Sequence, residues 1–183
     1  IIAIGIAHKV PHILLHPKGN FSVIEQNTGQ ITRLENGQNY QVEADEDNRL
    51  IIGKHLFIGP TRLLRASPGD YALIAGKKYR GNILFQANRD ATLTVIDEIE
   101  IEDYLNGVLP HEMSPSWPLE ALKAQAVVSR SFALSQLGRY SPSGYDLTDN
   151  ALSQLYNGIQ IESPIVSEAI ISTWHKAIAQ GIQ

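Results

Sequence analysis

The sequence predicts an α+β fold, with a β-rich N-terminal lobe packed against a helical C-terminal lobe. From residue 1 to about residue 98, short apolar runs alternate with turn-forming residues, which is typical of short strands. After about residue 99, apolar residues recur at helical spacing between residues that favour helix ends. A chain of 183 residues suits one domain of moderate size or two small lobes.

Turn-forming residues divide the first part of the chain into candidate hairpins. Asn-Gly is the strongest short hairpin signal, and related pairs behave similarly. Three such signals separate β-favouring segments: Gly19-Asn20, Asn27-Thr28-Gly29 and Asn36-Gly37. A further turn at 88–90 is expected to join two strands, one with Phe85 and the other with Leu93, Val95 and Ile99.

Three helices are expected in the second part. The stretch 100–108, "EIEDYLNGV", has acidic residues in its first turn and Gly107 as a stop. The best-supported helix covers 118–137, with Pro118 in its first turn and a stop at Gly138. A third covers 163–178, with Ser163 as N-cap. A long polar connection, 140–163, precedes it, and loops of that length are usually functional or disordered.

Composition excludes several classes of function. The net charge of −4 does not favour nucleic-acid binding. The chain has no cysteine, so it has neither disulfides nor thiolate metal sites. It has no apolar run of about 18 residues, so no membrane span is expected, and its first ten residues read as a strand. The histidines at 8, 12 and 16 have helical spacing but lie among prolines, so no metal site is expected there.

Glu112 has an unusual setting. Pro110 and Pro115 restrict the backbone on both sides, and Met113 and Trp117 could shield the carboxyl from water. Burial disfavours a charged carboxylate, and a carboxyl that keeps its proton can act as a general acid. On residue types alone, an exposed loop glutamate is the commoner interpretation.

The whole stretch around Glu112 changes that balance. "YLNGVLPHEMSPSWPLEALKAQAVVSRSFAL" closely resembles the signature of the stage II sporulation protein D (SpoIID)/LytB amidase-enhancer family, as do "SQLYNG" and "EAIISTWHKAI" further on. The resemblance covers about Tyr79 to Ala179. It implies a β-rich N-terminal lobe at 1–78 and a SpoIID/LytB-like catalytic or glycan-binding domain at 79–183.

The resemblance implies peptidoglycan chemistry outside the cytoplasmic membrane. Sporulation members are lytic transglycosylases, which cleave the MurNAc–GlcNAc bond in glycan strands stripped of stem peptides and leave 1,6-anhydro ends. The family's essential glutamate maps onto Glu112, and its lysine and arginine positions map onto Lys123 and Arg130. Tyr145, Gln154 and Tyr156 are further candidates for sugar contact. Some members carry a zinc site, but Thr148 and Ser153 stand near its cysteine positions, so no metal or cofactor is expected.

Other interpretations stay open. Lys123 and Arg130 could form a solvated, ion-paired helix face, the candidates on the connection could be ordinary loop packing, and Trp117 could be a core or pocket-wall residue. The chain could be a non-catalytic enhancer that binds glycan or an N-acetylmuramoyl-L-alanine amidase. It could also be a wall-binding protein whose β lobe carries the function.

Overall fold

A computed structural model describes residues 1–178, so the last five residues of the expected second domain lie outside the described part. The chain forms two compact units, called here the β unit, Ile4–Glu98, and the helical unit, Ile1–Ala3 with Ile99–Gln183. The α+β class is confirmed, with strands concentrated in the first part and helices in the second. By internal contacts the units divide after Glu98, and the expected domain boundary after residue 78 stays a prediction.

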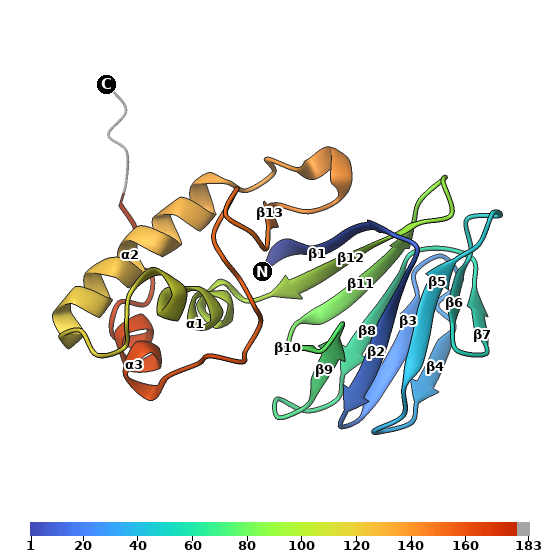
Figure 1. The fold of residues 1–183 in the computed structure, drawn as a ribbon, viewed down its shortest axis with the longest axis horizontal. Coiled ribbons are helices and arrows are strands. Elements are labelled where there is room, and N and C mark those ends of the chain that lie inside the picture. The colour runs from blue at the N-terminus through green and yellow to red at the C-terminus, as the bar shows by residue number, and fades with distance from the viewer. Residues whose placement is uncertain (179–183) are drawn as a thin grey trace. The chain divides into compact units, whose positions relative to one another are not determined.

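Thirteen strands are found among the described residues (Figure 1). The first six are β1 Ile2–Val10, β2 His12–Lys18, β3 Phe21–Glu25, β4 Ile31–Leu34, β5 Tyr40–Ala44 and β6 Leu50–Ile52. The others are β7 His55–Phe57, β8 Thr61–Arg65, β9 Tyr71–Ile74, β10 Lys77–Tyr79, β11 Asn82–Ala87, β12 Leu93–Ile99 and β13 Leu147–Thr148. One sheet has the order β13-β1-β12-β11-β8-β3-β4, and the other β10-β9-β2-β5-β6-β7.

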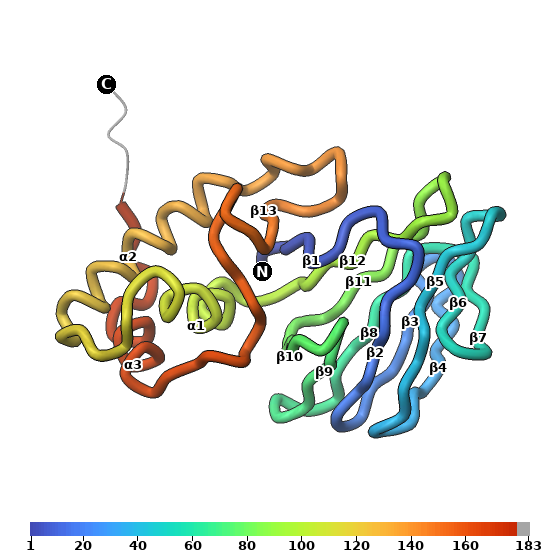
Figure 2. Tube along the Cα trace, viewed as in Figure 1, coloured from blue at the N-terminus to red at the C-terminus, as the bar shows by residue number. Residues whose placement is uncertain are grey.

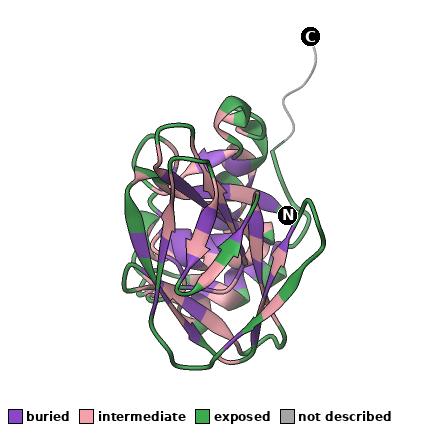
Figure 3. Cartoon of the chain, turned by 90° about the vertical axis from the view of Figure 1, so that its right-hand side faces the viewer, coloured by how far each residue is buried: buried purple, intermediate pink, exposed green. Residues whose placement is uncertain are grey.

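The core of the β unit follows from alternation along the strands. In β2 and β3 every second side chain is buried, and β11 buries Ile83 and Phe85 in the same alternation, as period-two strands with one covered face require. Figure 3 shows buried and less buried stretches following one another along the strands. Leu15 of one sheet and Val23, Leu63 and Phe85 of the other have no exposed surface. These apolar faces, rather than the turns, decide which strands share a sheet.

Two of the three early turn signals do not close hairpins. The Asn27–Gly29 turn does join paired strands, since Phe21 faces Leu34 and Ile24 faces Ile31. Gly19-Asn20 and Asn36-Gly37 instead lead from a strand of one sheet to a strand of the other, so those expectations were wrong. The turn residues fix local backbone direction only. The turn at 88–90 is confirmed, because β11 and β12 pair from Asn82 with Glu98 to Ala87 with Leu93.

Three α-helices form the helical unit: α1 Ile101–Glu112, α2 Leu119–Ser135 and α3 Pro164–Ser172. Gly107 was expected to stop α1, but the helix continues through Gly107 and Pro110 to Glu112. For α2, Pro118 is the N-cap, and Gly138 adopts a positive φ of 76° three residues past the end. Ser163 and Pro164 begin α3 as expected, but the helix ends at Ser172, six residues early.

The connection between α2 and α3 is largely irregular. It holds a 3-10 turn at Ser141–Ser143 and strand β13, and Figure 2 traces it past α1 to the start of α3. Asp146 fixes its first part, since its carboxylate accepts the backbone N–H of Ala3 at 2.9 Å and of Gly138 at 2.8 Å. Within residues 1–178, none of the helices combines the length and apolarity needed to cross a membrane.

Candidate functional site

Glu112 is the last residue of α1, and its side chain is exposed. The stiff loop expected around it is instead the end of a helix, closed by the backbone N–H of Met113 donating to the Leu109 carbonyl at 2.9 Å. Trp117 was expected to be a core or pocket-wall residue, but it is 54% exposed. The carboxyl is therefore open to an approaching molecule, and the shielding from water expected from Trp117 is not found.

A buried tyrosine on the same helix lies within electrostatic range of the Glu112 carboxylate. Tyr104 comes two turns earlier on α1 and has no exposed surface. Its hydroxyl donates to Oε1 of Gln154 at 3.3 Å. Burial raises the pKa of the Tyr104 hydroxyl well above its ordinary value, and the negative charge of Glu112 raises that pKa further. The two groups thus lie within electrostatic range of each other.

Gly107 lets the connecting segment approach α1 closely. A Cβ at this position would lie 2.6 Å from both the Gly158 carbonyl oxygen and a ring carbon of Tyr156. Only a glycine permits that approach without a shift. Near the end of the helix, Nδ2 of Asn157 lies 3.2 Å from Nε2 of His111. The segment 154–158 is therefore held along the same helix that ends in Glu112.

Gln154 and Tyr156 were expected to contact sugar, and both are buried beneath this region. Gln154 is 7% exposed and Tyr156 is fully covered. The Tyr156 ring centroid is 5.1 Å from that of Tyr104, in a tilted aromatic contact. A covered ring does not have the exposed face that stacking on a sugar requires. In this arrangement both residues pack against Tyr104 on the helix that ends in Glu112.

Tyr145 belongs to a different part of the connection. It is buried, and its ring stacks on that of Tyr140, with the centroids 5.6 Å apart. These two tyrosines follow the C-terminal end of α2, whereas the chain enters α2 shortly after Glu112. Lys123, near the start of α2, is half-buried, and its ammonium group contacts Oε1 of Glu120 at 2.7 Å. This pair matches the ion-paired helix face that the sequence also allowed.

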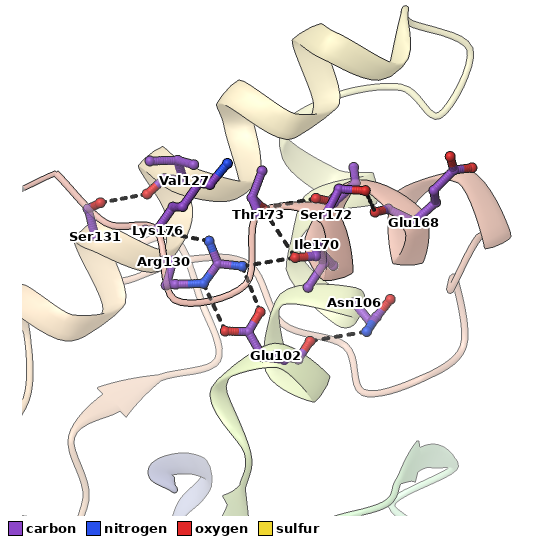
Figure 4. A network of polar contacts seen from close by, with 11 residues as sticks. Glu102, Asn106, Val127, Arg130, Ser131, Glu168, Ile170, Ser172, Thr173 and Lys176 are labelled. Carbon is purple, nitrogen blue, oxygen red and sulfur yellow. Dashed lines mark hydrogen bonds and ion pairs between the residues drawn. The ribbon is translucent and has the colours of Figure 1, made fainter.

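Arg130 is an internal link between helices (Figure 4). Only 2% of it is exposed, and Nε and Nη2 contact the two carboxylate oxygens of Glu102 on α1 at 2.8 and 2.6 Å. Nη1 donates to the Lys176 carbonyl at 3.0 Å, and Nη2 also reaches the Ile170 carbonyl at 3.4 Å. With its nitrogens committed to the protein, the guanidinium is not in the position that direct sugar binding needs.

The structure thus packs Gln154 and Tyr156 against Tyr104, on the helix that ends in Glu112, and engages Lys123, Arg130 and Tyr145 elsewhere. Sequence reasoning missed Tyr104 and the packing role of Gly107. Tyr104 lies eight residues before Glu112, a spacing of little more than two helical turns. The sequence predicts this relation only if the helix is taken to continue through Gly107 to Glu112. Among residues 1–178 no cluster of three potential metal ligands occurs, and the expected lack of a metal or cofactor stays a prediction.

Comparison with known proteins identifies the family. The family model described as SpoIID, stage II sporulation protein, matches residues 89–180, about half of the chain. An uncharacterized protein of Brachyspira hyodysenteriae is 42% identical over 108 residues, which are 58% of this chain and 29% of that protein. The amidase enhancer of Bacillus subtilis is 37% identical over 101 residues, 52% of this chain and 14% of that protein.

The chain therefore spans less than a third of the length of either relative. No solved structure matches it. The matched region contains α1, α2, α3 and the segment that packs on Gly107, and so includes every candidate site residue. These matches support a role related to the cell wall. With its model matched over half of the sequence, the chain belongs to the SpoIID family of stage II sporulation proteins.

Proposed function

We propose that this protein is a peptidoglycan lytic transglycosylase that cleaves MurNAc–GlcNAc bonds and uses Glu112 as its single acid and base. The observation that carries the proposal is the position of this carboxyl, exposed at the end of α1 and within electrostatic range of the buried Tyr104 hydroxyl. An exposed carboxyl on a helix end can reach a bond within a polymer. The packed segment 154–158 holds that helix end in place.

The chemistry needs only one carboxyl group. Protonated Glu112 donates its proton to the glycosidic oxygen, and the C1–O bond breaks with its electron pair leaving on that oxygen. The MurNAc ring then carries an oxocarbenium-like charge. Its own 6-hydroxyl oxygen bonds to C1, and the Glu112 carboxylate takes the hydroxyl proton. The residue is thereby returned to its starting state.

A hydrolytic glycosidase differs in needing two carboxyl groups, one for the leaving group and one for a nucleophile or water. The 6-hydroxyl of the sugar replaces that second group in a transglycosylase. A lone glutamate is thus compatible with the proposed reaction. Since the substrate lies outside the cytoplasmic membrane, the proposed location is extracytoplasmic.

A second candidate is a non-catalytic enhancer of a cell-wall amidase. The similarity to the amidase enhancer of Bacillus subtilis favours it. In this role the exposed end of α1 would contact glycan or the amidase, and Glu112 would contribute binding rather than proton transfer. The proposed partners in both cases are peptidoglycan glycan strands, with an amidase as a second partner.

A digest of peptide-stripped peptidoglycan tests the two candidates. The protein, its Glu112→Gln variant and its Glu168→Gln variant are compared by mass spectrometry of the products. Glu168 is a matched control, because it is also an exposed helical glutamate of the helical unit. Anhydro ends from the parent and Glu168→Gln, but not from Glu112→Gln, support the transglycosylase. Unchanged glycan with all three, together with faster release of stem peptides from intact peptidoglycan by an added amidase, supports the enhancer.

A further inference from the structure

Arg33 lies between two hollows on the surface of the β unit. Its side chain is exposed on β4, the end strand of its sheet, and it lines both hollows. One, of about 290 Å³, includes Asn20 and Ser22. The other, of about 260 Å³, includes Gln38 and Lys54. Together they form a track, called here the Arg33 track, in which amide or hydroxyl side chains lie on both sides of one guanidinium, and the second hollow also includes the Glu35 carboxylate.

The cations of the Arg33 track outnumber its acid, because Arg33 and Lys54 line a hollow that includes one carboxylate, that of Glu35. Within the described part of the chain, Arg33, Lys54 and the neighbouring His55 form no ion pair, although the chain as a whole carries a net charge of −4. The residue opposite Arg33 on β3 is Ser22, not an acid. Arg49, Arg62 and Arg130, by contrast, each bind a carboxylate. Arg33 and Lys54 therefore present two charges to solvent across one hollow.

The second hollow has a fixed floor. Tyr40 is buried beneath it, and its hydroxyl accepts the backbone N–H of Glu35 at 2.8 Å. Gly53, with φ of 60°, lies over the Tyr40 ring, where an added Cβ would be 3.0 Å from a ring carbon. On the rim, Oδ1 of Asn39 is 2.6 Å from Nδ1 of His16. The lining is thus held by its own contacts before any ligand arrives.

We propose that the Arg33 track binds a carboxylate-bearing sugar of a glycan strand. A guanidinium presents paired N–H donors that match the two oxygens of a carboxylate, and Lys54 adds a second charge. Amide and hydroxyl side chains such as Gln38 and Ser22 suit the hydroxyl and acetamido groups of the flanking sugars. Two adjoining hollows suit successive units of a polymer better than one small anion. The identity of the sugar as N-acetylmuramic acid rests on the proposed function.

A titration followed by NMR chemical shifts tests this site in the intact chain. The probes are N-acetylmuramic acid, the uncharged N-acetylglucosamine and inorganic phosphate, each added to the parent protein and to Arg33→Gln, Lys54→Gln and Arg89→Gln. Arg89→Gln removes the same charge from an exposed turn of the β unit that does not line the track. We expect N-acetylmuramic acid to perturb residues of the track and to bind at least about tenfold more weakly to Arg33→Gln. Lys54→Gln weakens binding less, and Arg89→Gln leaves it unchanged.

Three results overturn the proposal. The first is equal affinity of the parent protein for the two sugars, and the second is an equal loss of affinity for N-acetylmuramic acid in Arg89→Gln and Arg33→Gln. The third is tighter binding of phosphate than of N-acetylmuramic acid, which would assign the track to phosphate. The outcome is separable from that of the catalytic proposal. Loss of anhydro products in Glu112→Gln tests the reaction, while Arg33→Gln is read by sugar binding, so either proposal can fail while the other stands.

Discussion

Arg130 of α2 forms a two-point ion pair with Glu102 of α1. Its Nε lies 2.8 Å from Oε1 of Glu102, and its Nη2 lies 2.6 Å from Oε2. The same guanidinium donates to carbonyls at and beyond the end of α3, at Ile170 and Lys176. One side chain therefore ties together all three helices. Because the arginine is buried, its loss would leave Glu102 without this partner and the Lys176 carbonyl without this donor, whereas the Ile170 carbonyl would still accept from Thr173.

Arg130→Ala is expected to lower the free energy of unfolding by about 2–3 kcal/mol, since it removes a buried guanidinium and its hydrogen bonds, while the Glu102 carboxylate left behind is partly exposed. Arg130→Lys should recover only part of this, because an ammonium cannot form the two-point contact. Chemical denaturation measures both, with Arg89→Ala as an exposed control. Equal stability of Arg130→Ala and Arg89→Ala would show that the pair does not hold the helices together.

Gly107→Ala should destabilise the protein, although glycine to alanine inside a helix ordinarily stabilises it by about 0.5–1 kcal/mol. The added methyl group would lie 2.6 Å from the Gly158 carbonyl oxygen and from Tyr156, and such crowding costs about 1–3 kcal/mol. Gly69→Ala is the control, because a Cβ there meets nothing within 4 Å. A stabilised Gly107→Ala variant would mean that the segment 154–158 does not pack on α1.

Tyr104 predicts a stability change at alkaline pH. Its folded-state pKa is raised above the ordinary value of about 10, so folding favours the protonated hydroxyl. This contribution is fully present below pH 10 and is lost as pH rises above 10. Melting temperatures from pH 8 to 11 should therefore fall less steeply in Tyr104→Phe than in the parent. Tyr71→Phe, on β9, is the comparison variant, and identical slopes for Tyr104→Phe and the parent would contradict the prediction.

Lys123 of α2 pairs with Glu120, and its expected role in sugar binding stays a prediction. Its ion pair with Glu120 is a surface contact between residues three apart, so Lys123→Ala should change stability by no more than about 0.5 kcal/mol. If the ammonium binds glycan, the same variant raises KM for strand cleavage while kcat changes little. Glu120→Ala serves as control, because it breaks the same pair and keeps the lysine. An unchanged KM in Lys123→Ala would remove Lys123 from the site.

Much of the fold could be predicted from local sequence patterns. The hairpin at Asn27–Gly29, the β11–β12 pair and the start of α3 at Ser163 and Pro164 each follow from a turn or cap beside a clear period. Local patterns gave wrong predictions where contacts with residues distant in the sequence determine the structure. Asn36-Gly37 makes a turn between sheets because burial of strand faces sets pairing, and Gly107 serves close packing with Gly158 rather than helix termination.

The candidate site was harder to predict than the fold. The motif around Glu112 identified the carboxyl, but its exposure could not be deduced from neighbours such as Trp117, whose ring faces solvent. Arg130 and Lys123 share a helix face by spacing, yet one is buried on Glu102 and the other pairs with Glu120. The position of a lysine or arginine in a sequence does not predict which carboxylate it will pair with. The packing of α1 against α2 determines the partner of Arg130, whereas Lys123 pairs within its own helix.

The most direct test of the central claim is the rate at which peptide-stripped glycan strands gain 1,6-anhydro ends with the parent and with Glu112→Gln. Positioned proton transfer contributes about 10²- to 10⁴-fold to a rate. The account predicts a loss of at least about 100-fold in Glu112→Gln, with the melting temperature unchanged because the side chain is exposed. Anhydro ends formed equally fast by Glu112→Gln would contradict it.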